Sequence, residues 1–225
     1  MWLAHVQLLD SALPIGAFSH SFGLETLVQQ GKIQNAEDLK QYVETMLWGT
    51  WAAGDAMGIK AVYEYVPQEQ WLELWEIDQA LHVQRMAKES REGLQKMGKR
   101  LLRLSQTMYP RLVWGPLLDA LATHQCYGAY PVVYGWITYQ LEVPVEQAVQ
   151  GYLYNGLIAS MNNAVRLMAL GQTEAQVLLA TLLPQIEQAW REVESYDPSQ
   201  FYNSNPLAEI AMMQHESLYS RLFMS

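Results

Sequence analysis

The sequence predicts an all-α protein, a single-domain bundle of roughly nine to ten helices around one buried central helix. Apolar residues recur at helical spacing through most of the chain. The segment with the strongest strand propensity, residues 130–141, has no convincing partner strand, and a lone strand is not stable. Residues 148–170 form the longest run with a single formal charge, Arg166, which is typical of a buried helix.

Composition limits the class of protein. A chain of 225 residues, 50% of them hydrophobic, can bury the core of one domain over residues 1–225. The net charge of -9 argues against nucleic acid as a partner. One cysteine, Cys126, excludes an intramolecular disulfide, and the start of the chain lacks the features of a secretory signal. We therefore expect a cytoplasmic protein, and its many Trp, Tyr and Met residues favour association with other proteins.

The first third of the chain is predicted to contain a loop and several helices. Residues 11–25 include one proline and two glycines, which is typical of a loop, and they lead into a helix that ends near Gln30. Asn35 is predicted to cap the next helix, because two acidic residues follow it in the first turn. The helical pattern weakens at three glycines and resumes until Pro67 ends it.

The middle of the chain is predicted to be a long helical stretch followed by a buried helix. Residues 68–108 are rich in helix-forming residues and stop ahead of Pro110. Residues 85–106 are the one basic stretch, which we interpret as a solvated helix face with ion pairs at four-residue spacing. Residues 130–141 are predicted to be a buried helix, against their strand propensity.

The central helix, at about residues 146–170, carries a stripe of small and polar residues along one side. Three asparagines and an arginine would be costly in hydrocarbon, which argues against a membrane span. Two interpretations of the stripe remain open: a buried hydrogen-bond network, or the wall of a polar passage or subunit contact. The residues concerned are Asn155, Asn162, Asn163 and Arg166.

The last part of the chain is predicted to be one long helix, a loop and a terminal segment. Thr173 and Gln176 have the spacing of a capping box, which would start that helix. Pro184 is expected to bend it. We expect the N-terminal segment, residues 1–12, and the C-terminal tail, residues 206–225, to be the flexible parts of the domain.

The sequence has no motif that indicates an enzyme. It lacks a phosphate-binding loop, a dinucleotide-binding glycine motif, HExxH and CxxC, so we predict no catalytic residue, no metal site and no cofactor. His124 and Cys126 form a lone HxC, whereas zinc sites usually have three or four ligands. A helical metal-binding protein stays open as an alternative at this point.

Four strings of the sequence add a resemblance. LLDSALPIGAFSHSFGLE, AYPVVYGW, YLYNGLIASMNNAVRLMALGQTEAQ and HESLYSRLFMS together resemble the urease accessory protein UreF family, in the expected order over nearly the whole chain. The resemblance implies an all-helical homodimer that acts as a chaperone and catalyses no reaction. It implies that the protein binds UreD (also called UreH) and the GTPase UreG, and that the complex inserts nickel into apo-urease.

The resemblance also implies a partner-binding site made from the two ends of the chain. A tyrosine often occupies the position of Phe18 in the family, so any role of that hydroxyl is absent here. Arg221 could serve UreG in GTP hydrolysis or make a simple contact, and a regulator of GTP hydrolysis is therefore an alternative function. The candidate partner-binding residues are Pro14, Gly16, Phe18, His20, Ser21, Glu25, His215, Glu216, Leu218, Tyr219, Arg221, Leu222 and Phe223.

Overall fold

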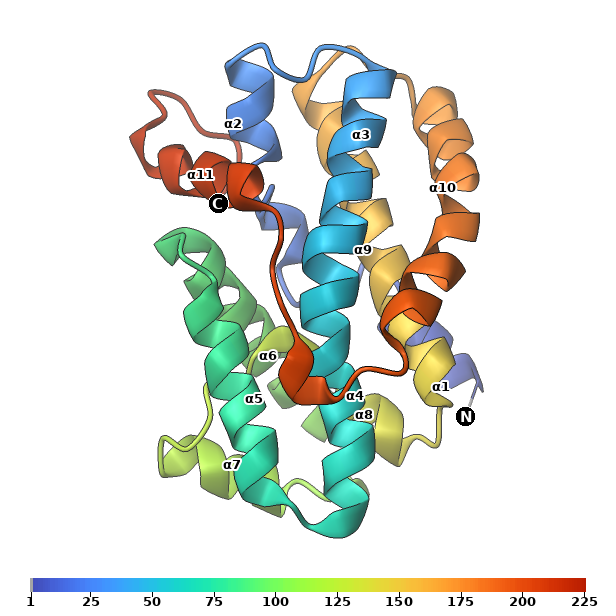
Figure 1. The fold of residues 1–225 in the computed structure, drawn as a ribbon, viewed down its shortest axis with the longest axis vertical. Helices are drawn as coiled ribbons and strands as arrows, with labels where there is room; N and C mark the ends of the chain where they lie inside the picture. The colour runs from blue at the N-terminus through green and yellow to red at the C-terminus, as the bar shows by residue number, and fades with distance from the viewer. Residues whose placement is uncertain (1) are drawn as a thin grey trace.

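The computed structural model describes residues 2–225, and within that range all regular secondary structure is helical, without a β-strand (Figure 1). The predicted fold class is confirmed. The predicted N-terminal segment 1–12 begins at Met1, which lies outside the described residues. The α-helices are α1 (Trp2–Leu8), α2 (Leu24–Gln29), α3 (Ala36–Met46), α4 (Ala56–Tyr65), α5 (Trp71–Gln84), α6 (Lys88–Met108), α7 (Gly115–Ala122), α8 (Tyr130–Gln140), α9 (Val145–Leu167), α10 (Gln172–Val193) and α11 (Pro206–Gln214).

Helix α9 is the central helix that the sequence predicts. It packs against α10, α4, α2 and α8, so that it has neighbours on several sides. Leu153 and Leu157 are fully buried on it, and Met161 nearly so. Burial of a leucine side chain stabilises a fold by about 1.5–3 kcal/mol, so this apolar helix contributes much of the core.

Helices α3 and α4 are joined without a loop by the π-helix η2 (Leu47–Asp55). Asn35 caps α3 as predicted, because its side chain accepts hydrogen bonds from the main-chain N–H groups of Glu37 and Asp38. Of the three glycines at which the predicted helical pattern weakens, Gly49 and Gly54 lie in this π-helix and Gly58 lies in α4.

An extended segment, residues 201–205, lies along this π-helix and runs between α3 and α5 toward α11 (Figure 1). The N–H of Tyr202 donates to the carbonyl of Ala53 over 3.0 Å, and that of Ser204 to the carbonyl of Gly49 over 2.9 Å. A Cβ on Gly49 would lie 2.7 Å from Ser204 Oγ, so the missing side chain permits the approach.

Helix α8 confirms the prediction of a buried helix at residues 130–141. Tyr134 and Ile137 are fully buried, and the helix packs closely on α4. Gly135 makes that contact possible, because a Cβ there would lie 3.1 Å from Ile59 Cα. Burial on all sides explains why β-branched and aromatic residues, which suit a strand, occupy a helix here.

Two predicted details are wrong. The predicted helix 68–108 is interrupted at residues 85–87, where Arg85 is extended and turns into the interior. Glu209 accepts the main-chain N–H of Met86 over 3.1 Å, which replaces a helical hydrogen bond. Thr173 does not cap α10: this helix starts at Gln172, after Gly171, without a side-chain cap.

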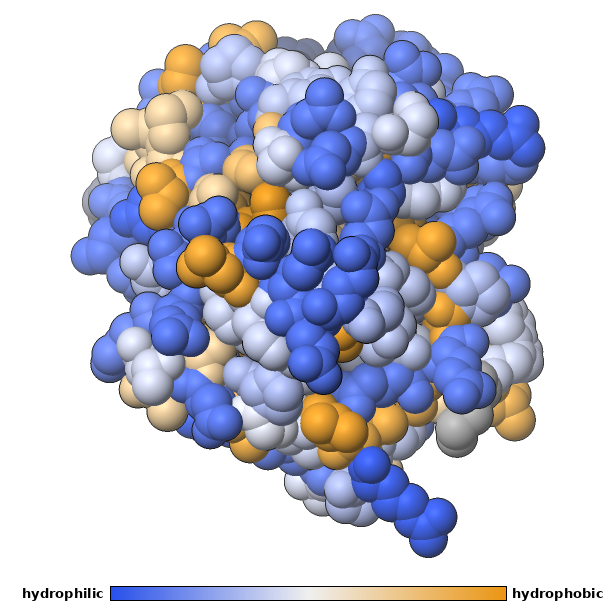
Figure 2. Space-filling view, turned by 60° about the horizontal axis from the view of Figure 1, so that its bottom comes forward, coloured by the Kyte–Doolittle hydropathy of each residue, from blue (hydrophilic) through white to orange (hydrophobic). Residues whose placement is uncertain are grey.

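The surface carries hydrophobic residues in small groups. On the face that Figure 2 shows, these groups are separated by hydrophilic residues, which is ordinary for a globular protein. Within residues 2–225, no helix combines the length and apolar character that a membrane crossing requires.

Candidate partner-binding site

The two ends of the chain, which the resemblance singles out separately, lie against each other. The main-chain oxygen of Ser225 accepts hydrogen bonds from Phe22 N–H over 3.2 Å and from Ser21 Oγ over 2.8 Å. The N–H of Met224 donates to the carbonyl of Ser19 over 2.7 Å. Residues 215–225, the last part of the predicted tail 206–225, therefore dock on the loop that precedes α2, and from here on the tail means residues 215–225.

Two glycines shape the loop that receives the tail. Gly16 and Gly23 have φ angles of 87° and 95°, a left-handed conformation that other residues rarely adopt. A Cβ on Gly23 would lie 3.3 Å from the side chain of Ala211 on α11. The glycines thus turn the loop toward α11 and leave room for the chain to return.

Glu25, at the start of α2, is the main anchor of the tail. Its side chain is buried, and its Oε1 accepts the N–H of Leu222 over 2.6 Å. Its Oε2 accepts the N–H of Phe223 over 3.1 Å and faces Nε2 of His215 over 3.0 Å. A buried carboxylate must be hydrogen-bonded, and Glu25 meets this requirement almost entirely with atoms of residues 215–223.

His215 lies between two carboxylates. Nε2 faces Glu25, and Nδ1 lies 2.6 Å from Oε2 of Glu89 on α6. Each ring nitrogen of His215 thus has a carboxylate oxygen as its partner. Arg221 pairs with the other oxygen of Glu89 over 2.7 Å. Two side chains of the tail, those of His215 and Arg221, are thereby joined to two carboxylates of the body of the protein.

His20 lies on the inner side of the same loop and is held neutral. Its Nδ1 lies 2.7 Å from Ser225 Oγ, and its main-chain oxygen accepts the side-chain amide of Asn163 over 2.8 Å. Burial, together with the nearby charges of Lys96 and Arg100, lowers the pKa of His20 from 6.5 to about 4. His20 therefore serves as a neutral hydrogen-bonding group at neutral pH.

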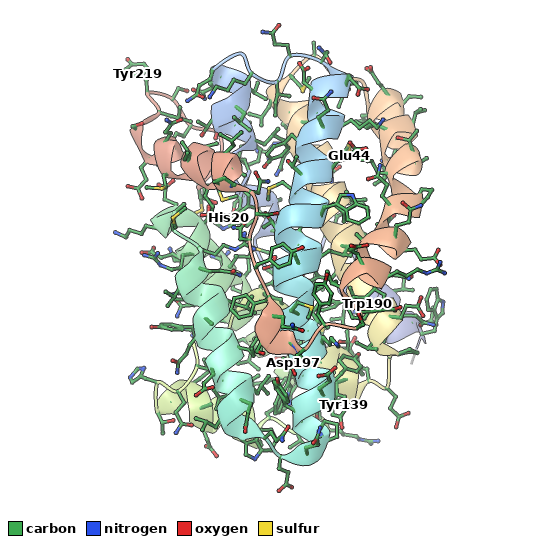
Figure 3. All side chains as sticks on the ribbon, viewed as in Figure 1. His20, Glu44, Tyr139, Trp190, Asp197 and Tyr219 are labelled. Carbon is green, nitrogen blue, oxygen red and sulfur yellow. The ribbon has the colours of Figure 1, made fainter. Side chains whose placement is uncertain are left out.

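The outer side of the docked tail is apolar and exposed. Tyr219 points away from the protein into solvent, whereas His20 lies inside (Figure 3). Phe18 of the loop is 66% exposed, and Leu222 and Met224 of the tail are exposed as well. Phe223, in contrast, is buried under the guanidinium of Arg166, which lies 4.4 Å from its ring centroid. The site therefore combines a buried polar frame with exposed apolar side chains.

The candidate residues fall into two groups by exposure. Those that a partner could touch directly are Pro14, Phe18, Glu216, Tyr219, Arg221 and Leu222, with Leu218 half-buried. Those that are buried are Gly16, His20, Ser21, Glu25, His215 and Phe223. The buried group positions the exposed one.

The polar stripe of α9 is divided between a network and a cavity. Asn163 donates to His20, and Arg166 donates to the carbonyl of Phe18 over 3.0 Å, so these two residues support the loop of the site. Asn155, Asn162 and also Asn163 line a cavity of about 130 Å³, in which Asn155 has a long contact of 3.5 Å to the carbonyl of Leu8. This volume exceeds what one water molecule needs.

A buried ionic cluster beside this cavity has no counterpart in the sequence predictions. Asp55 pairs with Arg85 over 2.6 Å and accepts the hydroxyl of Tyr152 over 3.0 Å. Arg85 also lies 3.7 Å from Glu209 on α11. Burial alone would lower the pKa of Arg85, but Asp55 and Glu209 outweigh it and raise the pKa. One feature of the sequence could have predicted this cluster: Asp55 is a lone carboxylate in an apolar stretch. A carboxylate that is buried with such a stretch needs a buried partner.

The cysteine and histidine of the lone HxC differ in exposure. Cys126 is buried, and burial raises the pKa of its thiol to about 12. His124 is exposed. In the part of the chain that the structure describes, residues 2–225, no group of three or more His, Cys, Asp or Glu side chains is placed to hold a metal ion.

Comparison with known proteins agrees with this architecture. The family model UreF matches residues 33–183. The chain is 34% identical to the urease accessory protein UreF of Lachnoclostridium phytofermentans over 220 residues, which cover 98% of this chain and 96% of that relative.

Two further relatives that carry the same name are similar over almost their whole length. The chain is 32% identical to the protein of Actinobacillus pleuropneumoniae serotype 5b, over 99% of this chain and 98% of the relative. It is 33% identical to the protein of Bacillus sp. strain TB-90, with the same coverage. These matches span the central helices and both ends of the chain, and the chain belongs to the UreF family of urease accessory proteins.

Proposed function

We propose that this protein is a non-catalytic assembly factor for urease, which binds UreD/UreH and the GTPase UreG and supports nickel insertion into apo-urease as a cytoplasmic homodimer. Membership of the UreF family supports the general role in urease maturation. The observation that carries the proposal is the pairing of the two ends of the chain into one surface, fixed from beneath by Glu25.

The site has the composition of a protein-binding surface. Exposed aromatic and aliphatic anchors, such as Phe18, Tyr219 and Leu222, supply apolar area to an interface. The buried hydrogen bonds of Glu25 and His215 fix the direction of the tail beforehand, which lowers the entropy cost of binding. We expect the exposed residues to contact the partner and the buried residues to position them.

Complex formation tests this proposal. The purified full-length chain is mixed with UreD/UreH and UreG of the same organism and followed by size exclusion with light scattering. We expect Tyr219→Ala/Leu222→Ala to remove the larger species. The matched control is Leu72→Ala/Val177→Ala, two exposed aliphatic residues on other helices. Undiminished assembly by the tail variant would refute the site, and a wild-type chain that binds neither partner would refute the function.

Arg221 is assigned to tail docking in this proposal, because it pairs with Glu89 over 2.7 Å. The alternative, a direct role in GTP hydrolysis by UreG, is tested with Arg221→Ala at saturating concentration of the chain. Unchanged turnover of GTP supports the docking role. A lower turnover with the complex intact would assign the guanidinium to hydrolysis instead.

The cavity beside α9 supports a second proposal, a polar passage with Asn155 and Asn162 in its wall. Asn162→Leu would make this wall apolar. We expect a lower nickel content of urease, while the complex with UreD/UreH and UreG still forms. Arg166→Met serves as the comparison, because Arg166 supports the loop through the carbonyl of Phe18 but does not line the cavity. Normal nickel content with Asn162→Leu would argue against a passage.

A further inference from the structure

Helix α6 presents a basic stripe on its exposed face. Its side chains stand at positions i, i+3, i+4 and i+7, which share one side of a helix. Residues 93–118 contain no Asp or Glu at all, in a chain whose net charge is -9. The stripe consists of Lys96, Lys99, Arg100 and Arg103, all exposed.

Most of this charge is not neutralised within the protein. Ion pairs at four-residue spacing occur at the start of α6, where Glu92 lies 4.0 Å from Lys88 and 3.2 Å from Lys96. Over residues 2–225, no ion pair involves Lys99, Arg100 or Arg103. The predicted ion pairs at four-residue spacing are therefore present only in the first part of α6, at residues 88–96.

The basic stripe borders the loop that receives the tail. Arg100 Nη1 lies 3.5 Å from the carbonyl of Ile15, and a Cβ on Gly16 would lie 2.1 Å from the same nitrogen. The guanidinium of Arg100 thus lies against the backbone of this loop, and exposed Phe18 follows two residues after Gly16. The positive charge of Lys96 and Arg100 also reaches inward, since it lowers the pKa of His20. An apolar anchor and uncompensated cations therefore lie on one surface.

We propose that the basic stripe, together with Phe18, binds an acidic segment of another protein, one that combines several carboxylates with an apolar side chain. Arginine can pair with a carboxylate through two parallel hydrogen bonds, and the stripe offers two arginines. The stripe extends over roughly 10 Å along the helix axis, a length that suits one short peptide segment. A long polyanion such as nucleic acid, or an anionic membrane, would also meet the remaining acidic surface and be repelled.

This interaction goes beyond the proposed role in nickel delivery and does not depend on it. The experiment therefore uses a synthetic probe and the full-length chain. The probe is a fluorescein-labelled 16-residue peptide of four Glu-Glu-Leu-Glu repeats, and the reference peptide has Gln in place of every Glu. Binding is measured by fluorescence anisotropy between about 50 and 300 mM NaCl, because contacts between exposed charges weaken with salt.

The test variant is Lys99→Glu/Arg103→Glu, and the control is Lys32→Glu/Arg191→Glu, which makes the same change of net charge at exposed positions elsewhere. We expect the test variant to weaken binding of the acidic peptide at least about tenfold and to remove its salt dependence. The control should change binding less than about twofold. Circular dichroism confirms that both variants remain folded.

Three results would overturn the proposal. One is wild-type binding of the acidic peptide that is no tighter than binding of the Gln peptide. Another is an equal loss of binding in the test and control variants. The third is tighter binding of the oligonucleotide dT16, or of phosphatidylcholine vesicles containing phosphatidylserine, than of the acidic peptide. Formation of the complex with UreD/UreH and UreG is measured separately, so failure of one proposal does not imply failure of the other.

Discussion

Glu25 Oε2 lies 3.0 Å from Nε2 of His215, and both side chains are buried although 190 residues separate them in the chain. The same carboxylate accepts the N–H groups of Leu222 and Phe223. One acidic side chain near the start of the chain therefore fixes both the turn at His215 and the end of the tail at Leu222 and Phe223.

Glu25→Gln is expected to loosen the tail. The substitution replaces one carboxylate oxygen by an N–H₂ group, which cannot accept the hydrogen bonds that Oε1 or Oε2 now receives. Leaving buried donors unpaired costs about 1–3 kcal/mol of unfolding free energy. Chemical denaturation should show this loss, and amide hydrogen exchange of residues 215–225 should become faster.

The control for this substitution is Glu216→Gln, because Glu216 neighbours His215 in sequence but is exposed. We expect its stability to lie within about 0.5 kcal/mol of the wild type. Equal exchange rates of the tail in Glu25→Gln and wild type would show that the carboxylate does not hold it.

Arg85→Met is expected to be among the most destabilising single substitutions in the protein. It leaves the carboxylates of Asp55 and Glu209 buried without their cation, and breaking a buried pair in this way costs about 3–5 kcal/mol. Arg191→Met removes an exposed pair with Glu187, which contributes about 0–1 kcal/mol. Urea denaturation of both variants measures the difference, and similar midpoints would contradict the importance of the buried cluster.

Gly98→Ala tests a close contact between α6 and the loop before α8. Alanine ordinarily stabilises a helix by about 1 kcal/mol relative to glycine. Here, however, the new Cβ would lie 2.1 Å from the carbonyl oxygen of Gly128, and this backbone has to move. We expect a lower melting temperature for this variant.

Gly171→Ala is the matched control for Gly98. Nothing lies within 4 Å of a Cβ at this position, and its φ of -73° suits an L-residue. Its melting temperature should stay near that of the wild type. A Gly98→Ala variant as stable as this control would mean that the two segments are not in close contact.

The stability of the protein is expected to fall in mild acid because of His20. Burial, with a contribution from Lys96 and Arg100, lowers its pKa from 6.5 to about 4 in the folded chain. Between these pH values the unfolded chain binds more protons, so the free energy of unfolding decreases as the pH falls from about 6.5 to 4. The full effect of His20 is roughly 3 kcal/mol.

Thermal unfolding between pH 4 and 7.5 measures this effect. His20→Asn keeps a hydrogen-bonding side chain but does not titrate, so its stability should depend less on pH than that of the wild type. His124→Asn is the control, since His124 is exposed and lies at a φ of 59° that asparagine tolerates. A pH dependence of His20→Asn equal to that of the wild type would exclude His20 as its source.

Local rules predicted much of the fold. The cap at Asn35 follows from side-chain chemistry within four residues, and the central helix follows from an apolar run. Helix α8 was predicted correctly only because no partner strand was available, since its residue propensities favour a strand. Where neighbours in the sequence decide the structure, the prediction succeeds.

Long-range contacts account for what the sequence did not reveal. The break at residues 85–87 depends on Asp55 and Glu209, which are remote in the sequence, and no local pattern marks it. The resemblance identified Glu25 and His215 as residues of one site, but not as partners of each other. Because both side chains are buried, Glu25 and His215 cannot contact a partner directly. They act on the partner by positioning the exposed residues of the loop and the tail.

The contact between the extended segment 201–205 and the π-helix bears on how the chain folds. Each hydrogen bond, from Tyr202 to Ala53 and from Ser204 to Gly49, closes a loop of about 150 residues. Closing a flexible loop of that length costs roughly 4 kcal/mol of chain entropy, and this cost precedes the stabilisation that the contact provides. These two bonds cannot form until the ribosome has synthesised residues 202 and 204, respectively. We therefore expect helices α3 to α10 to assemble first, and the closing of this segment to be a late and slow step of folding.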